Sequence, residues 1–353
     1  MTRVFVYETT SADPLCADEE LQAQGRSMRD AMLADLVRID GLQVACAVSG
    51  EAPPATLQAS RLVPEVSPVP EKRSAPGLQS VRAVRPAAGE AAADFLRRQA
   101  RLHDLIWVVA PESDGLLANL RAAVTDRQWL GCSARAIAIA ASKRTTCRQL
   151  QAAGIAATEP HEPGDLPSAA VAEAHWIVKP DDGCGAAGAR RHRSFAQARA
   201  DFTDRLRRDE RVVMEPWIEG EPLSLSVLCG EREVEVLAVN RQRISVDRSG
   251  WLRFDGVSPY HASASQAAVL ASLARRIVAA IPGLGGYIGV DLTWHPVRGP
   301  VVVEINPRVT CSYEGLSQRI GRNVAQQMLT MHRRAYAVAQ SDALASTDAG
   351  PIG

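Results

Sequence analysis

The sequence of 353 residues lacks several features that would assign it to a class of protein at once. Its formal net charge is +0, so no overall field favours nucleic acid or an anionic membrane as a partner. No apolar run reaches the ~20 residues that a membrane-spanning helix needs, and the N-terminal residues show no cleavable signal pattern. The seven cysteines include no CxxC pair, which argues against a zinc site or a disulfide framework. We therefore expect a cytoplasmic protein with reduced thiols and with neither nucleic acid nor membrane as a partner.

Lysine is also scarce. Only three of the 40 basic residues are lysines, namely Lys72, Lys143 and Lys179, and the others are arginines. Where arginine is the usual cation, a lysine indicates a site that needs a compact, flexible ammonium group rather than a planar guanidinium. Lys72 lies in a proline-rich stretch and carries no functional prediction. Lys143 and Lys179 are therefore the two cations that a function must explain.

Strand-like and helix-like segments alternate over residues 1–132 and predict a parallel sheet with helices on its faces. The strand-like segments are residues 3–8, 42–48, 80–84 and 103–111, and the helix-like segments are residues 18–39 and 89–101. A proline-rich insertion at residues 49–79 interrupts this alternation. Polar residues that follow the strand ends are candidates either for a ligand site or for turns and caps, and they are Glu8, Thr9, Thr10, Glu112 and Ser113.

A second domain is predicted over residues 133–336, with a small lobe at 133–212, a C-terminal lobe of antiparallel strands at 213–336 and a disordered tail at 337–353. In the small lobe, a helix that carries Lys143 precedes a strand that ends near Lys179 and the loop "KPDDGCGAAG". Gly183, Gly185 and Gly188 of this loop can expose backbone N–H groups to a phosphate. The loop is not a Walker motif, because its lysine comes before the glycines.

The segment "GYIGVDLTWHPVRGPVVVEINPRVT" predicts two antiparallel strands around a turn that contains proline and glycine. If the turn is symmetric about the bond between residues 297 and 298, Asp291 and Glu304 become cross-strand partners with Cβ atoms roughly 5 Å apart. Asn306 then shares a face with Glu304, and Gly289 opposite it leaves open space. Facing carboxylates need a cation between them, and carboxylate and amide oxygens suit Mg²⁺. The alternative is a pair of solvated carboxylates on an exposed hairpin.

The order of these parts resembles the ATP-grasp superfamily. The shared parts are a helix-borne lysine, a strand lysine followed by a glycine loop, the segment "MEPWIEGE", and Asp…Glu-x-Asn on a hairpin. The resemblance covers residues 112–330 and implies an α/β (α+β) ATP-grasp fold behind a pre-ATP-grasp domain. It implies that both lysines and the glycine loop bind the phosphates of ATP. It also implies that Asp291, Glu304 and Asn306 bind Mg²⁺, with two ions expected and Mn²⁺ as an alternative.

The same resemblance implies roles for further residues. Backbone groups of a hinge would contact adenine, and an acid would contact the ribose; these residues are Glu215, Pro216, Trp217, Ile218 and Glu221, with Glu219 as a rival to Glu221. Arg308 and Arg241 are catalytic candidates that would hold the acyl phosphate or the substrate carboxylate, the alternative being surface salt bridges. Residues that follow the hairpin of the predicted metal ligands, called the metal hairpin below, are candidates for amine contacts or for loop and cap positions. They are Ser312, Tyr313 and Glu314.

Within the superfamily, the segments "EINPRVTCSYEGLSQ", "VYETT", "QGRSMRDAMLADL" and "APESDGLLANL" look most similar to tyramine–glutamate ligase-like proteins. That resemblance implies an ATP-dependent ligase that joins the γ-carboxyl of glutamate to tyramine, tyrosine or a related amine through an acyl phosphate, in methylofuran-type cofactor biosynthesis. Its partners would be small-molecule carboxylate and amine substrates. Two alternatives stay open, a ligase for another amino acid, peptide or cofactor precursor and a non-catalytic nucleotide-binding module. The oligomeric state also stays open, a homodimer being one option.

Overall fold

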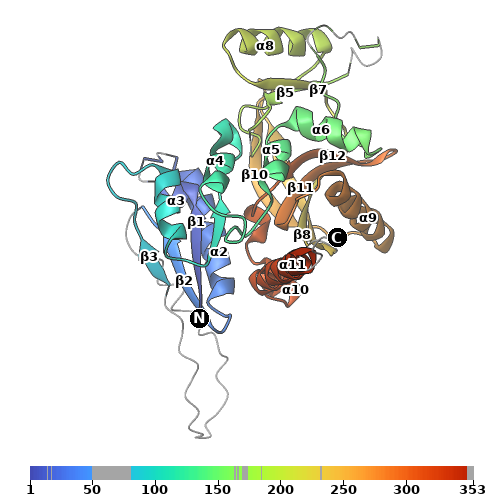
Figure 1. Cartoon of the computed structure of the whole chain (residues 1–353). Coiled ribbons are helices and arrows are strands. Elements are labelled where there is room, and N and C mark those ends of the chain that lie inside the picture. The colour runs from blue at the N-terminus through green and yellow to red at the C-terminus, as the bar shows by residue number, and fades with distance from the viewer. Residues whose placement is uncertain are drawn as a thin grey trace, which may run out of the picture. The chain divides into compact units, whose positions relative to one another are not determined.

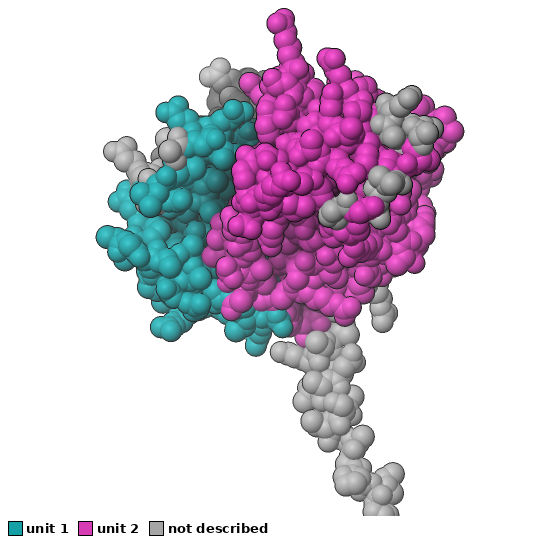
Figure 2. Space-filling model, turned by 90° about the horizontal axis from the view of Figure 1, so that it is seen from above, with its two compact units in different colours: residues 1–109, 123–130, 313–329 teal, residues 110–122, 131–312, 330–353 magenta. Residues whose placement is uncertain are grey.

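The computed structural model describes residues 1–347 except for 14, 17, 50–80, 163, 165, 166, 169–173, 184, 231 and 232, with backbone alone from 337 to 347. The predicted insertion at 49–79 lies outside these residues, apart from residue 49. The chain divides into two compact units, which Figure 2 colours separately. The first comprises Met1–Val109, Ala123–Leu130 and Tyr313–Leu329, and the second comprises Ala110–Ala122, Gly131–Ser312 and Thr330–Gly353. Both units are discontinuous in sequence, whereas we predicted a single boundary between residues 132 and 133.

The first unit is built on a four-stranded parallel sheet in the order β3-β2-β1-β4. Its strands are β1 (Thr2–Glu8), β2 (Leu42–Ala47), β3 (Arg82–Val84) and β4 (Leu105–Val109). Its helices are α1 (Thr9–Ala12), α2 (Glu19–Leu36), α3 (Ala92–Ala100) and α10 (Leu316–Ile320). Strand β4 is buried along its whole length, as expected for a parallel strand that is covered on both faces. The predicted parallel α/β arrangement of the N-terminal part is confirmed.

A late segment of the chain is tied into this first unit through one buried carboxylate. Asp35 of α2 accepts hydrogen bonds from the Tyr313 hydroxyl at 2.8 Å and from Ser317 Oγ at 2.5 Å. The Asn323 side chain donates to the backbone carbonyl of Asp35 at 2.8 Å. Burial raises the pKa of Asp35, although these hydroxyl donors oppose that shift. Residues 313–323 therefore complete the first unit.

The second unit contains a three-stranded antiparallel sheet in the order β6-β5-β7. Its strands are β5 (Trp176–Pro180), β6 (Arg190–His192) and β7 (Val212–Pro216). Helix α8 (Phe195–Arg207) begins at the N-cap Ser194 and covers one face of this sheet (Figure 1). Trp176, Val178 and Met214 of the sheet form a core with Phe195 and Phe202 of the helix. This small lobe carries Lys179 at the end of β5.

The second unit also contains a five-stranded antiparallel sheet in the order β10-β9-β8-β11-β12. Its strands are β8 (Glu221–Cys229), β9 (Val234–Val246), β10 (Leu252–Pro259), β11 (Gly286–His295) and β12 (Gly299–Asn306). One face is apolar, with Leu225, Val290 and Ile305 buried, and the opposite face carries the predicted metal ligands, as alternation along each strand requires. Helix α9 (Ala264–Ala280) packs against β9 of this sheet.

Shorter elements connect these sheets. They are η2 (Ser113–Gly115), α4 (Leu116–Ala122), α5 (Ala134–Ala140), α6 (Lys143–Ala152) and η3 (Cys311–Tyr313). Gly220 lies where the hinge after β7 crosses the end of β11, and its φ is +147°. A Cβ at this position would lie 2.4 Å from the carbonyl oxygen of Trp294, so only glycine fits here. The close approach of the hinge to β11 therefore depends on this residue.

Helix α11 (Val324–Thr347) extends past residue 336, where we predicted the ordered chain to end. The alanine-rich segment after residue 336 has high helix propensity, and lengthening an existing helix avoids the cost of nucleation. Residues 348–353 of the predicted tail lie outside the described part of the chain. No helix among the described residues is long and apolar enough to span a membrane. The six described cysteines are all free thiols, as predicted.

Candidate active site

The hairpin of β11 and β12 brings together the predicted metal ligands. Asp291 pairs with Glu304 and Gly289 pairs with Asn306, so the predicted register is confirmed at these positions. The predicted symmetry of the turn is wrong, because His295 pairs with Gly299 and the turn is therefore centred on residue 297. The register shifts by one residue between Asp291 and Leu292. The bulge left by this shift restores the pairing of the two carboxylates.

The two carboxylates lie in surroundings that favour a bound cation. Burial and the charge of Glu304 raise the pKa of Asp291 to about 7. The Asn306 side chain donates to Asp291 Oδ2 at 3.1 Å and partly offsets this shift. No group of three or more His, Cys, Asp or Glu side chains suited to a metal occurs among the described residues. The donor set is thus two carboxylates and an amide oxygen, which fits Mg²⁺ when phosphate oxygens and water complete its shell.

The space that we predicted above Gly289 is filled. A Cβ at Gly289 would lie 2.7 Å from the Thr310 methyl carbon, since the loop after β12 folds back over the sheet. The Thr310 and Ser312 hydroxyls lie 2.8 Å apart, and Ser312 Oγ lies 2.9 Å from the Tyr287 hydroxyl. Glycine at 289 therefore lets the loop pack closely instead of leaving room for a ligand.

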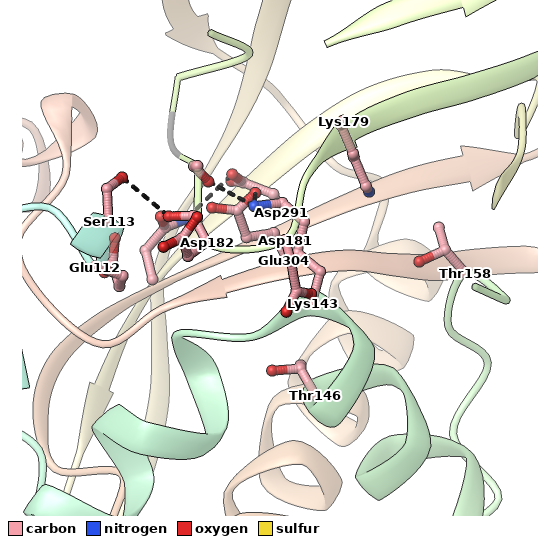
Figure 3. Close-up of polar contacts among 12 residues, drawn as sticks. Glu112, Ser113, Lys143, Thr146, Thr158, Lys179, Asp181, Asp182, Asp291 and Glu304 are labelled. Atoms are coloured by element: carbon pink, nitrogen blue, oxygen red, sulfur yellow. Dashed lines mark hydrogen bonds and ion pairs between the residues drawn. The ribbon is translucent and has the colours of Figure 1, made fainter. Parts of the chain in front are cut away.

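Lys143 joins the metal hairpin to the glycine loop. It is the first residue of α6, and Ser142 is the N-cap. Its Nζ lies 3.2 Å from Glu304 Oε2 and donates to the Gly183 carbonyl at 2.5 Å. Figure 3 shows Lys143 close to Glu304 and Asp291. The structure thus brings one predicted phosphate ligand directly to the predicted metal site.

Lys179 has a different partner. Its Nζ lies 2.7 Å from Glu215 Oε2, and the two side chains are 7% and 0% exposed. Burial alone would lower the pKa of Lys179, but the Glu215 carboxylate outweighs it and the net shift is upward. We predicted Glu215 as part of the adenine hinge. Its side chain neutralises Lys179, which leaves its backbone for the predicted contact with adenine.

The glycine loop is shaped by two backbone conformations that favour glycine. Gly185 has φ +63° and Gly188 has φ +68°, both in the left-handed region. Gly183 packs on Pro180, because a Cβ there would lie 2.9 Å from the proline Cβ. The Arg205 guanidinium of α8 donates to the Gly188 carbonyl at 2.8 Å. The three predicted glycines therefore belong to one compact loop at the end of β5.

Two aspartates at the base of this loop were not predicted. Asp181 accepts hydrogen bonds at the start of α6, from the Lys143 N–H through its carbonyl at 3.0 Å and from the Arg144 N–H through its carboxylate at 2.9 Å. Asp182 accepts from Ser113 Oγ through its carbonyl and from the Asp114 N–H through its carboxylate, each at 3.0 Å (Figure 3). Their position beside the glycines in "KPDDG" is the signal that could have identified them as anchors of the loop.

The two predicted catalytic arginines have different surroundings. Arg308 is held by both carboxylate oxygens of Glu112, each at 3.0 Å, and the two side chains are 11% and 5% exposed. Glu112 was noted only as a residue after a strand, and its bidentate grip on Arg308 was not predicted. Arg241 forms an exposed ion pair with Glu221 and lies over the ring of Tyr260 at 5.4 Å. Arg308 is therefore fixed beside the metal hairpin, whereas Arg241 is solvent-exposed.

The hinge residues lie between the two sheets of this unit. The Trp217 N–H bonds to the His175 carbonyl at 2.9 Å, and the Arg191 guanidinium lies 5.3 Å from the Trp217 ring centroid. Pro216 ends β7, and Ile218 follows in the irregular segment before β8. Glu219 is 68% exposed near His175, whereas the side chain of Glu221 at the start of β8 is 30% exposed. The difference in exposure leaves Glu221 as the better fixed of the two ribose candidates.

The three residues after the hairpin that were candidates for amine contacts differ in burial. Ser312 is 3% exposed and belongs to the hydroxyl network around Tyr287. Tyr313 is 1% exposed, and its hydroxyl is bound to Asp35 in the first unit. Glu314 is exposed. The first two side chains are therefore structural residues in this conformation.

A buried lysine at the start of α6, a second at the end of β5, the glycine loop after that strand and the carboxylate hairpin of the large sheet together define a fold of the ATP-grasp type. Residues 140–312 match the model of the ATP-grasp domain, and residues 65–137 match the model of the pre ATP-grasp 3 domain. The chain belongs to the ATP-grasp superfamily, as its sequence pattern predicted.

Among curated proteins, the chain is similar to tyramine–L-glutamate ligase of Methanocaldococcus jannaschii, with 30% identity over 215 residues. This match spans 60% of the chain and 58% of that relative's length. Among solved structures, an ATP-grasp superfamily protein from Archaeoglobus fulgidus has a TM-score of 0.64 and 23% identity, covering 94% of this chain and 88% of that one. The D-alanine–D-alanine ligase of Bacillus anthracis complexed with ATP has a TM-score of 0.61 and 13% identity, covering 95% and 98%. These structures share the fold.

Proposed function

We propose that the protein is an ATP-dependent carboxylate–amine ligase that acts through an acyl phosphate. The observation that carries this proposal is the contact between Lys143 and Glu304, whose atoms Nζ and Oε2 lie 3.2 Å apart. Glu304 also faces Asp291 across the hairpin. A cation suited to phosphate therefore adjoins two carboxylates suited to a metal, which is the chemistry that phosphoryl transfer requires.

The residues of this site have distinct roles in the proposed reaction. Lys143 and Lys179 hold phosphate oxygens of ATP, and the N–H groups of the glycine loop cover them. Asp291, Glu304 and Asn306 hold the divalent metal. When bound, Mg²⁺ neutralises charge on the β- and γ-phosphates and polarises the γ-phosphorus. Further predicted contacts are those of the hinge 215–218 with adenine and of Glu221 with the ribose, Glu219 being the alternative.

The proposed chemistry has two steps. A carboxylate oxygen of the acid attacks the γ-phosphorus, and the bond to the β-phosphate oxygen breaks to release ADP. The amine nitrogen then attacks the acyl carbon, and phosphate leaves as the amide forms and the nitrogen loses a proton. Arg308 donates hydrogen bonds to the substrate carboxylate and then to the acyl phosphate formed from it, and Glu112 holds its guanidinium in one orientation. Arg241 is a second candidate for the substrate carboxylate.

The proposed substrates are L-glutamate, through its γ-carboxyl, and tyramine, tyrosine or a related amine. The similarity to the ligase of Methanocaldococcus jannaschii supports this choice, although the match covers 58% of that protein. A role in methylofuran-type biosynthesis rests only on the resemblance of the sequence segments and is a further part of the proposal. Mg²⁺ rather than Mn²⁺, a cytoplasmic location and the absence of a nucleic-acid partner remain predictions from the sequence.

The test is a product analysis with purified protein, MgATP, L-glutamate and tyramine. We expect release of ADP and phosphate and a product with the mass of a γ-glutamyl amide of tyramine. Glutamate with hydroxylamine in place of the amine should give a hydroxamate, because the acyl phosphate forms before the amine reacts. Coupling of another acid and amine pair would replace the substrates but keep the ligase. AMP as the product would refute the acyl phosphate, and ATP binding without any turnover would favour the non-catalytic module.

A further inference from the structure

A row of polar side chains continues from the metal hairpin across the large sheet. Asp291 on β11 pairs with Glu304 on β12 and with Ser224 on β8. Ser224 in turn pairs with Asn240 on β9. Directly paired residues of antiparallel strands project from the same face, so the four side chains lie side by side across four strands. Two of them are the predicted metal ligands, Asn240 donates to Ser226 Oγ at 3.4 Å, and Ser224 has no assigned role.

Ser224 differs from the next serine on the same face of β8. Ser224 is 6% exposed, and its hydroxyl has no hydrogen-bond partner within the part of the chain that the structure describes. Ser226 is 0% exposed, but its hydroxyl accepts from the Tyr287 hydroxyl at 2.9 Å and lies 3.1 Å from Ser312 Oγ. A buried hydroxyl without a partner is unfavourable. Ser226 therefore has a structural use, whereas the Ser224 hydroxyl is a buried donor that no described residue satisfies.

Gln242 of β9 lies near this part of the sheet. Its side chain lies close enough to Asp291 to lower the pKa of that carboxyl. Gln242 is on β9 and Asp291 on β11, and β8 lies between these strands. The Gln242 amide must therefore cross β8 next to Ser224. An unbranched, partly exposed side chain can rotate away once a metal ion takes over Asp291.

The two ends of the row are suited to different anions, the phosphates of the nucleotide and the carboxylate of the acid. Lys143, the predicted phosphate ligand, contacts Glu304 at one end of the row. Ser224 lies on the other side of Asp291, one strand further from that lysine. Phosphates of the nucleotide are thus expected at the Glu304 end. The carboxylate that receives the phosphoryl group is expected at the Ser224 end.

We propose that the Ser224 hydroxyl and the Gln242 amide form the subsite that binds the reacting carboxylate of the acid substrate beside Asp291. This inference rests on the proposed ligase function and adds two specificity-determining residues to it. Both groups donate hydrogen bonds without carrying a charge. They can therefore hold a carboxylate at the metal edge while leaving its oxygen nucleophilic.

The test compares Ser224→Ala with Ser226→Ala in the full-length protein. The probe is L-glutamate, or the acid that supports ADP release if glutamate does not. For Ser224→Ala, we expect the KM for the acid to rise about 10- to 100-fold, the loss of one hydrogen bond to a charged group. The KM for ATP and the melting temperature should stay unchanged, because no bond within the protein is lost. Ser226→Ala should show the reverse, a lower melting temperature with an unchanged KM for the acid.

A binding measurement and a charge variant separate this inference from the ligase proposal. Calorimetric titration of the acid into protein with Mg²⁺ and a non-hydrolysable ATP analogue should show the same loss of affinity in Ser224→Ala, independently of turnover. Gln242→Glu should weaken acid binding further, since it adds a negative charge beside a carboxylate. If the wild type turns over and Ser224→Ala binds the acid normally, the subsite is wrong and the ligase proposal stands. If no acid supports ADP release by the wild type, both are wrong.

Discussion

Substitution of Glu215 by glutamine tests whether Lys179 is held by a single buried countercharge. Glu215 is 0% exposed and Lys179 is 7% exposed, and their charged atoms lie 2.7 Å apart. Apart from Lys179, no hydrogen-bond partner of either Glu215 oxygen occurs among the described residues, so the ion pair is the main interaction of this carboxylate. Removal of one partner of a buried ion pair costs about 3–5 kcal/mol. At about 2–4 °C per kcal/mol for a unit of this size, the melting temperature should fall by roughly 10 °C.

A matched control is Asp204→Asn on α8 of the same lobe. Asp204 and Arg208 lie 3.5 Å apart with 64% and 59% exposure, and an exposed pair contributes at most about 1 kcal/mol. Thermal unfolding followed by circular dichroism measures both variants. Equal melting temperatures for Glu215→Gln and the control would refute the assignment of this ion pair as buried and uncompensated.

The free energy of unfolding of Glu215→Gln should change with pH in a direction that can be stated. In the wild type, Glu215 raises the pKa of Lys179 above its ordinary value of 10.5, so this contribution to stability is lost only as the pH rises above that value. In Glu215→Gln, burial is opposed only by the smaller effects of Cys147 and Glu304, and we expect the pKa of Lys179 to fall below 10.5. Between this lowered pKa and 10.5, the unfolded state binds more protons than the folded state. The free energy of unfolding of the variant therefore rises with pH up to 10.5. The stability difference between the two proteins should therefore shrink as the pH rises.

Three further predictions concern the proposed chemistry. Glu304→Ala should abolish ADP release while leaving the circular dichroism spectrum unchanged, and near-normal turnover at saturating Mg²⁺ would rule out the metal assignment. Lys179→Arg should impair ATP use, because the planar guanidinium of arginine cannot replace the compact ammonium group beside Glu215. Lys72→Arg is the control, and equal kinetic constants in the two variants would contradict the phosphate role of Lys179. Glu112→Gln should lower kcat about 10-fold or more by freeing the Arg308 guanidinium, with the KM for ATP unchanged; a change confined to the KM for ATP would show that this pair serves nucleotide binding instead.

The pairing of Asp291 and Glu304 could be predicted because it follows from local rules. Alternation along a strand and antiparallel pairing around a short turn relate residues that are close in sequence. The bulge between Asp291 and Leu292 could not be predicted, since the alternation of residues along the strand does not mark it. We placed the centre of the turn half a residue too late and also assumed a regular strand. The two errors cancelled, so the predicted partners were correct.

Partners that are distant in sequence were not predictable from one chain. Glu112 and Arg308 are separated by 196 residues, and no periodic pattern relates them. Glu215 was identified by its place in the hinge motif, but the direction of its side chain is set by the pairing of β5 with β7. The loop over Gly289 was missed for the same reason, because a glycine signals close approach without identifying what approaches. The sequence pattern therefore located the residues of the site, but not the long-range contacts that fix their side chains in place.

The contribution of Tyr313, Ser317 and Asn323 to the first unit has a consequence for synthesis of the chain. A ribosome adds about 5–20 residues per second, so the segment after residue 312 follows residue 109 by about 10–40 s. During that time Asp35 lacks the hydroxyls that it binds in the finished protein, while most of the second unit has already been made. The part of the chain translated first is therefore among the last to reach its final fold. A chain that is interrupted near residue 312 should leave this N-terminal part open to proteases and chaperones, although all four strands of its sheet are present.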